Sequence, residues 1–379
     1  MTHRNGATLV LHGGSPTIAG QGTDRRVDRR ASRGVLKVWQ RAGTDSISSR
    51  LCYLAAGQLV RVDISTELIA HVSGVHHCGS PWACPICAPV VRERRAREVD
   101  LGVSSHLAGG GGGLFVTGTT RHAAPDRLEP RLALMSGALN AALNGRAWQS
   151  FRRWLGFMGA IRVVDVTYGE HGWHPHFHSV FVLEGPVEYD VMKAFDHWLF
   201  QRWDQICRGR GFGSVEREGV DVRPVGASDG LGGYLAKVEG GWGVGQELAR
   251  GDVKTGGSNP FEILGRAAEG DVLAGRLWRE YERATFDKRF LRWSPGLRTR
   301  LLPEVEEVTD VEAAAAEGVG IVLVSVWFRG EVWNLYVREG STGLVLAELE
   351  RAASDGDLPD VLEAWDGSFD PMALEQKEV

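Results

Sequence analysis

The sequence predicts an α+β fold in which helices pack on one face of an antiparallel sheet, with a small cysteine-containing segment before it and a small acidic α/β module after it. Segments 161–167 and 174–183 are rich in β-branched and aromatic residues and flank a turn-like stretch, so we expect them to form a hairpin. Residues 127–157 and 189–207 repeat apolar side chains every three or four positions, which indicates amphipathic helices. These patterns predict the sheet and the helices that cover it.

Further elements follow in chain order. We expect an edge strand at 215–225, a helix at 228–241 and a mainly helical stretch at 259–298. Near the C-terminus, residues 320–328 and 331–339 flank a short Arg-Gly turn and are expected to form a second hairpin.

These patterns divide the chain into four parts. Residues 1–45 are expected to be a flexible basic arm, with only a brief helix around 35–41. Residues 46–104 hold the cysteines and a basic helix, residues 105–302 the main sheet and a helical extension, and residues 303–379 the acidic module. A chain of 379 residues is long enough for two or three domains.

The charge is unevenly spread. Residues 303–379 hold 18 acidic and 4 basic residues, a net charge of −14, whereas the rest of the chain has a net charge of +9. The acidic module therefore masks a basic body that is suited to a nucleic-acid partner.

No stretch approaches the ~20 apolar residues of a membrane span, and no signal-peptide pattern is found, so we expect a cytoplasmic protein.

The cysteines predict a zinc site. Three of the five lie within ten residues: Cys78, Cys84 and Cys87. The Cys-Pro-Ile-Cys turn can place two thiolates on one tetrahedral zinc ion, and Cys78 gives a third ligand. Cys52 is our first choice for the fourth ligand, with His76 and His77 as alternatives. A redox role is less favoured, because a third cysteine is close by and no βαβ pattern precedes the turn.

Directly after the cysteines, residues 90–99 are expected to form a helix whose basic side chains are only partly balanced by Glu93 and Glu98. The basic residues are Arg92, Arg94, Arg95 and Arg97. Two interpretations stay open: a solvated charged helix, or a helix that contacts the DNA backbone beside the zinc site.

Histidines alternate along the returning strand of the predicted hairpin, at His174, His176 and His178. Alternate side chains of a strand share one face and lie about 6.6–6.8 Å apart, so two of these imidazoles can hold one metal ion. Imidazole is the commonest transition-metal ligand in proteins. Asp165, on the other strand of the hairpin, offers a carboxylate to the same ion.

Three motifs carry a resemblance to a known family: LFVTGTTRH as a first motif strand, DVTYGEHGWHPHFH as a metal-binding hairpin and GGYLAKV as a tyrosine motif. They resemble those of the replication initiator proteins of rolling-circle plasmids, members of the HUH endonuclease superfamily. The cysteine segment and residues 277–298 are similar to the form common in high-GC actinobacteria. The resemblance covers roughly residues 50–302 and neither terminal segment.

This resemblance implies an HUH-type sheet and a metal-dependent DNA endonuclease and strand transferase. Tyr234 would attack a phosphodiester at the plasmid's double-strand origin and remain linked to the 5′-phosphate, while the freed 3′-OH primes DNA synthesis. Lys237 would offset charge on the scissile phosphate. Asp229 is a further catalytic candidate, because some initiators place a Glu four residues before the tyrosine; here that position is Gly230, which leaves open how a replication round ends.

The resemblance also assigns the metal ligands. His176 and His178 would hold Mg²⁺ or Mn²⁺, with His174 as a possible further ligand. Asp165 would be the third ligand, at a position where similar proteins tend to have a longer Glu side chain.

The expected partners are an origin hairpin, a single-stranded nick site, a host helicase and a host polymerase, and a homodimer is possible. The alternatives are a transposase or relaxase of the same superfamily, a non-catalytic zinc-containing DNA-binding regulator, and a metal oxygenase.

Overall fold

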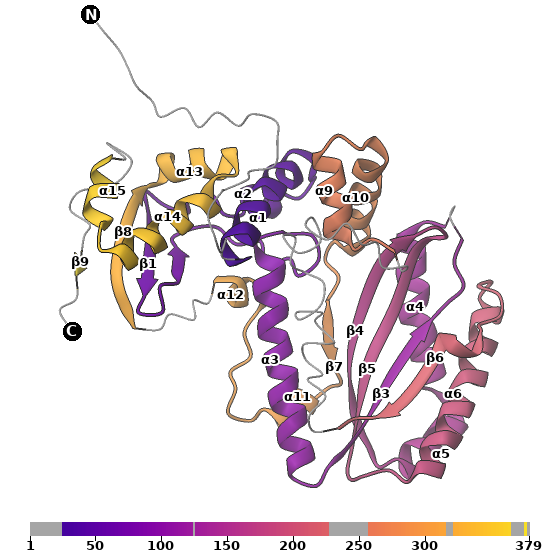
Figure 1. Cartoon of the computed structure of the whole chain (residues 1–379). Helices are drawn as coiled ribbons and strands as arrows, with labels where there is room; N and C mark the ends of the chain where they lie inside the picture. Colours follow the sequence, from indigo (N-terminus) through magenta and orange to yellow (C-terminus); the bar gives the residue numbers. More distant parts are fainter. Residues whose placement is uncertain (1–24, 124–125, 227–256, 316–320, 365–374, 377–379) are drawn as a thin grey trace, which may run out of the picture.

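The computed structural model describes residues 25–123, 126–226, 257–315, 321–364 and 375–376. Within these ranges the chain builds two antiparallel sheets, each covered by helices, as Figure 1 shows. The predicted α+β class is therefore confirmed. The helix expected at 228–241 lies outside the described residues.

The larger sheet has five strands in the order β6-β3-β5-β4-β7, and all of its pairs are antiparallel. Its strands are β3 (Gly112–Thr119), β4 (Phe157–Gly169), β5 (Gly172–Leu183), β6 (Val220–Pro224) and β7 (Leu291–Trp293). The central pair, β4 and β5, is the predicted hairpin, joined by a two-residue turn. The register places Asp165 directly opposite His176.

One face of this sheet is covered by three helices: α4 (Leu128–Ala142), α5 (Gly145–Trp154) and α6 (Tyr189–Gly209). Phe177 and Phe181 of β5 point to this side and pack against aromatic residues of the helices, with ring centroids 5.2 Å apart for Phe177 and Trp203. The indole Nε1 of Trp203 also donates a hydrogen bond to the Thr119 carbonyl oxygen at 2.7 Å. This contact fixes the end of β3 beside the histidine strand.

The opposite face is covered too, by α3 (Cys87–Ala108), α9 (Pro260–Ala268) and α10 (Val272–Thr285). The expectation of helices on one face only is thus wrong. Strand β5 explains the difference, because its four consecutive residues 180–183 are all buried, which requires a cover on both sides. The mainly helical stretch expected at 259–298 is confirmed: it holds α9 and α10, and Asn259 caps α9 with a capping box.

The smaller sheet has the order β2-β1-β8-β9. Its elements are β1 (Leu59–Ser65), β2 (Ala70–Ser73), β8 (Val322–Arg329) and β9 (Glu375–Gln376), with α13 (Gly330–Glu339), α14 (Thr342–Asp355) and α15 (Leu358–Ala364). Strand β8 pairs with β1 along the whole of β1, so the acidic C-terminal segment shares a sheet and a core with residues that precede the cysteines. In Figure 1 this unit lies beside one end of α3, and the larger sheet lies on the other side of that helix.

Two local predictions are wrong in this region. The expected second strand at 331–339 is helix α13, because Trp333 and Val337 lie four residues apart and both face the core, and the left-handed Gly340 (φ 77°) ends the helix. The brief helix expected around 35–41 is part of a longer helix, α1 (Arg25–Gly43), so residues 25–43 are not a flexible arm, and Lys37 and Gln40 of this helix are buried.

The remaining short elements are α2 (Ile47–Leu51), η1 (Arg217–Gly219), α11 (Leu297–Leu301) and α12 (Asp310–Ala315). Among the helices that the structure describes, none combines the length and the apolar character that crossing a membrane requires.

Candidate metal centres

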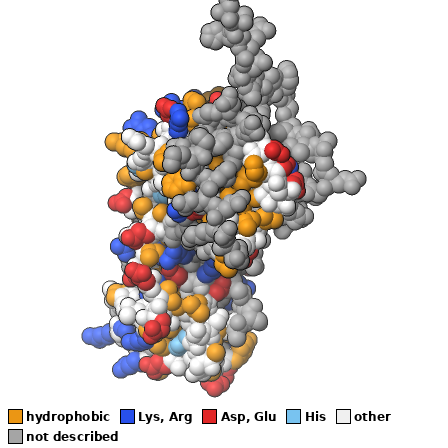
Figure 2. Space-filling view, turned by 90° about the vertical axis from the view of Figure 1, so that its left-hand side faces the viewer, with side chains coloured by type: hydrophobic (Ala, Val, Ile, Leu, Met, Phe, Trp, Pro, Cys, Tyr) orange, Lys and Arg blue, Asp and Glu red, His pale blue; other side chains and the backbone are white. Residues whose placement is uncertain are grey.

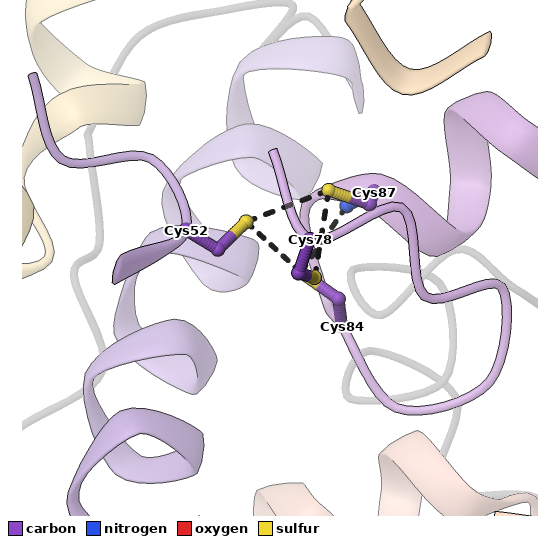
Figure 3. Close-up of side chains that lie close together, drawn as sticks. All are labelled: Cys52, Cys78, Cys84 and Cys87. Atoms are coloured by element: carbon purple, nitrogen blue, oxygen red, sulfur yellow. Dashed lines mark hydrogen bonds between the residues drawn. The ribbon is translucent and has the colours of Figure 1, made fainter. Parts of the chain in front are cut away.

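The four predicted cysteines converge (Figure 3). Cys52 follows α2, Cys78 and Cys84 lie in the loop before α3, and Cys87 is the first residue of α3. The Sγ atom of Cys52 lies 3.6 Å from that of Cys84 and 3.5 Å from that of Cys87, and the Sγ atoms of Cys78 and Cys87 are 3.9 Å apart. Four sulfurs at about 2.3 Å from a tetrahedral zinc ion lie about 3.8 Å apart, so this donor set fits zinc.

Cys52 is the fourth member of this group, as expected from the sequence. The alternatives lie outside the group of four: His77 is near, with Nδ1 3.8 Å from Cys87 Sγ, and His76 is exposed. Cys207, the fifth cysteine, is buried in α6 away from the cluster, as expected for a packing residue, and burial raises its pKa to about 12.

Lys37 lies against the cysteine cluster and was not found from the sequence, because it belongs to the segment expected to be flexible. Its Nζ atom lies 3.6 Å from Cys84 Sγ and donates to Gln40 Oε1 at 2.6 Å and to the Ser49 carbonyl oxygen at 2.8 Å. Burial lowers the pKa of Lys37, but the thiolates, Cys84 first, outweigh burial and raise it. The ammonium is thus a fixed positive charge beside the sulfurs.

The thiol of Cys84 responds to the same arrangement. Burial raises its pKa, but hydrogen bonds from the other three cysteines and the charge of Lys37 together hold the pKa well below its usual value. A thiolate is the form that binds a metal ion, so Cys84 is prepared for ligation.

A second group of metal-ligating atoms lies on the larger sheet and consists of Asp165, His176 and His178. Their candidate ligand atoms lie within 4.8 Å of one another, and His176 Nε2 is 3.2 Å from Asp165 Oδ2. His176 Nδ1 lies 3.3 Å from the His174 carbonyl oxygen, and His178 Nδ1 lies 3.3 Å from Thr117 Oγ1. Partners at Nδ1 orient both rings so that Nε2 is the nitrogen offered to an ion, and the set fits a divalent metal.

His174 is not in this group. Its Nε2 atom lies 2.6 Å from Thr119 Oγ1, and its ring stacks on that of His122 with centroids 4.5 Å apart. The structure thus holds His174 beside the centre, where its ring lies 5.3 Å from that of His176, rather than among the three converging ligands.

Arg92 of α3 and Tyr281 of α10 are both buried, and both lie within electrostatic range of Asp165. Arg92 is 2% exposed, donates from Nε to the Pro81 carbonyl oxygen at 2.6 Å and lies 4.0 Å from the ring centroid of Phe290. Burial lowers its pKa to about 10, against the opposing effects of Tyr281 and Asp165. Arg92 is therefore an interior residue, and the expectation that it contacts DNA is wrong, because no phosphate reaches a side chain buried in this way.

The other arginines of α3 differ in their surroundings. Arg95 is half-buried and bonded to Asp310 at 2.7 Å and to Glu98 at 3.1 Å. Arg97 has a 78% exposed side chain and pairs with Glu93, one turn earlier, and Arg94 lies 3.8 Å from Glu98. Figure 2 shows basic and acidic side chains intermixed on the visible face, without one continuous basic patch among the described residues.

The proposed catalytic residues Tyr234, Lys237 and Asp229 lie outside the described residues. Tyr281 is a buried packing residue, as expected from its sequence neighbours: its ring stacks on Trp173, and burial raises its pKa.

Fold and site together define a class: an α+β protein with a four-cysteine cluster fit for zinc and an Asp-His-His centre on an antiparallel sheet.

Comparison with known proteins finds proteins that are similar in sequence. The chain is 28% identical to "Protein rep" of Streptomyces lividans over 81% of this chain and 79% of that protein. A shorter match, 32% identical, joins 30% of this chain to 32% of "Neomycin resistance protein" of Streptomyces cyanogenus. No family model and no solved structure matches the chain. The similarity to Protein rep supports the resemblance to Rep-type proteins.

Proposed function

We propose that the protein initiates rolling-circle replication of a plasmid by nicking one DNA strand at the double-strand origin, as an HUH-type endonuclease. The convergence of Asp165, His176 and His178 on one sheet face carries the proposal. The similarity to Protein rep over four fifths of the chain supports the replication role. Such a protein acts where plasmid DNA is copied, in the cytoplasm, with a host helicase and polymerase as partners.

In the proposed reaction the Tyr234 oxygen bonds to the scissile phosphorus, the bond from phosphorus to the 3′-oxygen breaks, and the proton lost by the tyrosine is balanced by the one that the 3′-oxygen gains. One fragment then ends in a free 3′-OH, and the 5′-phosphate of the other fragment is bonded to the tyrosine. Lys237 offsets the charge that develops on the phosphate oxygens. Asp229 is the candidate base for a water molecule at the end of the round. The bond energy is conserved in the phosphotyrosine and serves the later rejoining.

A bound Mg²⁺ or Mn²⁺ would polarise the scissile phosphate. His176 and His178 would supply neutral imidazoles through Nε2; the His174 carbonyl oxygen, which can only accept, sets the His176 tautomer, and Thr117 Oγ1 would accept from Nδ1–H of His178. Asp165 would supply the anionic ligand. The four cysteines would hold a zinc ion with a structural role, because all four positions of a tetrahedral ion are then taken by protein.

The proposal is tested with single-stranded oligonucleotides that tile the replicon encoding the protein, incubated with the full chain and Mn²⁺ and separated on a denaturing gel. We expect one oligonucleotide to give a covalent protein adduct and a fragment with a free 3′-OH. Tyr234→Phe should lose the adduct, whereas Tyr189→Phe, at an exposed position of α6, should keep it. Cleavage that persists in Tyr234→Phe would refute the assigned nucleophile.

A related transposase or relaxase would give the same adduct but would act on a transposon end or a transfer origin rather than on the replication origin. A zinc-containing regulator would bind origin DNA but would not cleave it, whichever divalent metal ion is added. The same assay separates these alternatives.

A further inference from the structure

The loop between Cys78 and Cys87 is packed into the core of the larger sheet. Trp82, at the centre of this loop, is 4% exposed, and its Nε1 donates to the Lys288 carbonyl oxygen at 2.7 Å. Its ring meets those of Phe290 and Tyr281 edge-on, with centroids 5.4 Å and 6.4 Å away. The same loop therefore carries zinc ligands and a tryptophan that belongs to another core.

Tyr281 continues this packing to the histidine strand. Its hydroxyl donates to the Trp82 carbonyl oxygen at 3.3 Å, and its ring stacks on Trp173 with centroids 6.1 Å apart. Trp173 lies on β5, three residues before His176, and its ring meets that of Tyr168 on β4 at 5.0 Å. One buried tyrosine thus touches both the cysteine loop and the hairpin.

Arg92 adds a polar connection. It lies on α3, five residues after Cys87, and is bonded to Pro81 of the loop. The charge of Asp165, the proposed metal ligand, raises the pKa of both Arg92 and Tyr281, so the carboxylate lies within electrostatic range of these two groups. Groups around a metal ligand tune the affinity of that ligand for its ion.

A second line of buried contacts, which starts at Lys37, joins the cluster to α10. Lys37 lies 3.6 Å from Cys84 Sγ and donates to Gln40, and Gln40 Nε2 donates to Glu282 Oε1 at 2.6 Å. Glu282 is the sequence neighbour of Tyr281. Helix α10 is therefore fixed to the cysteine cluster at two adjacent residues.

We infer that zinc in the four-cysteine cluster sets the affinity of the Asp165-His176-His178 centre for its divalent ion, and that Trp82 transmits this effect through Tyr281 to the hairpin. The inference rests on the proposed metal role of that centre. Without zinc the loop between Cys78 and Cys87 loses the bonds that close it, so Trp82 is no longer held under Tyr281. The hairpin that carries Asp165, His176 and His178 then loses part of the packing that holds it in place.

Such a connection is reciprocal, so the divalent ion also strengthens zinc retention. Coupling between two sites in one protein is typically about 5–150-fold in affinity. We therefore expect a change of about tenfold or more in Mn²⁺ affinity when zinc is lost.

The test is a cycle of four full-length proteins: wild type, Cys84→Ser, Trp82→Ala and the double variant. Mn²⁺ affinity is measured by electron paramagnetic resonance, and zinc content by elemental analysis. Cys84→Ser should lose zinc and bind Mn²⁺ about tenfold more weakly or worse. Trp82→Ala should keep one zinc ion per chain and show a similar loss, and the double variant should lose little more. Trp154→Ala, at a 67% exposed position of α5, is the matched control and should bind Mn²⁺ like wild type.

Equal Mn²⁺ affinity in wild type and zinc-free Cys84→Ser would overturn the inference while leaving the metal role intact. Additive losses in the double variant would overturn Trp82 as the link. Failure of wild type to bind Mn²⁺ would overturn the metal role and the inference together. Thermal melting identifies a misfolded variant. If Trp82→Ala misfolds, Trp82→Phe replaces it, since Phe keeps one aromatic ring while it removes the donor to Lys288 and part of the buried indole; it should show a smaller loss of Mn²⁺ affinity at full zinc content.

Discussion

The Nζ atom of Lys37 lies 3.6 Å from the Sγ atom of Cys84, in a position where the lysine is only 2% exposed. A buried ammonium ion is costly unless it is paired and hydrogen-bonded. Four thiolates on one Zn²⁺ carry a net charge of −2, so the lysine offsets part of that charge. Helix α1 thereby contributes to the cluster, although it supplies no ligand.

Lys37→Met should weaken zinc retention. The substitution keeps the volume but removes a charged donor to sulfur, and donors to charged groups contribute about 1.5–3 kcal/mol. We expect zinc transfer to a chromogenic chelator to be about tenfold faster, since tenfold corresponds to about 1.4 kcal/mol. Lys193→Met, at an exposed position of α6, should release zinc like wild type. An unchanged transfer rate in Lys37→Met would show that the ammonium does not stabilise the metal-bound cluster.

Arg97→Ala should weaken DNA binding without reducing stability. Arg97 is the most exposed of the four predicted arginines. Among the described residues its side chain pairs with Glu93, and an ion pair as exposed as this one contributes little to folding. If Arg97 contacts a phosphate, the slope of log affinity against log salt concentration should fall by about one unit, equally for all DNA sequences. Binding isotherms at several salt concentrations check this.

Arg95→Ala on the same helix is the contrasting variant. Arg95 bonds Asp310 and the buried Glu98, so we expect its loss to lower the free energy of unfolding, by about 1.5–3 kcal/mol for a hydrogen bond to a charged group. If the slope of log affinity against log salt concentration is the same in Arg97→Ala as in wild type, the exposed arginine of this helix is solvated and does not contact the DNA backbone.

Much of the larger sheet could be predicted from the sequence, because the hairpin has a strong local signal. The alternation of His174, His176 and His178, opposite Asp165, depends only on strand period and register, and both are as expected. The second helical layer was missed, since strand period says nothing about what covers a face. The continuous apolar run at 180–183 was the sequence signal available for it, and these residues are all buried.

The sites divide in the same way. Cysteines have few alternative roles and short spacings, so Cys78, Cys84 and Cys87 could be grouped from the sequence, and Cys52 followed from the need for a fourth ligand. Lys37 could not be found, because its place depends on packing between segments far apart in the chain. Arg92 was misjudged for a related reason: an arginine in a charged helix gives no local sign that it faces a core.

The pairing of β8 with β1 predicts that the acidic C-terminal segment is not a detachable module. Residues 60, 62 and 64 of β1 are fully buried, and Val326 and Phe328 of β8 lie in the same core cluster. Truncation after residue 302 removes β8, α13 and α14, exposes this apolar surface and leaves β1 with an open edge, which favours aggregation. We expect a strong loss of soluble protein and of the cooperative thermal transition.

Truncation after residue 364 is the matched control. It keeps β8 and all three helices of the unit and removes β9, which pairs with β8 at only two positions. This shorter deletion should leave the yield and the melting temperature close to those of the full chain. A soluble, folded product from truncation after residue 302 would show instead that β1 and β2 are stable without their partner.

Glu282 should make stability depend on pH in a defined direction. Burial raises the pKa of Glu282, and hydrogen bonds from Gln40 and Thr44 oppose burial without cancelling it. A carboxyl group with a raised pKa in the folded state favours folding in its protonated form. Its contribution is fully present below the unfolded pKa and is lost as the pH rises through the folded pKa.

Glu282→Gln should therefore stabilise the protein most at high pH, because the amide keeps an oxygen that accepts from Gln40 and never ionises. We expect its melting temperature to exceed that of wild type by a few degrees at most at pH 8.5, and the difference to shrink as the pH falls to 5.5. Glu269→Gln, at an exposed position after α9, should melt like wild type throughout. A difference that grows toward low pH would mean that the carboxylate, through Lys37, stabilises the fold in its charged form and that burial is the smaller effect.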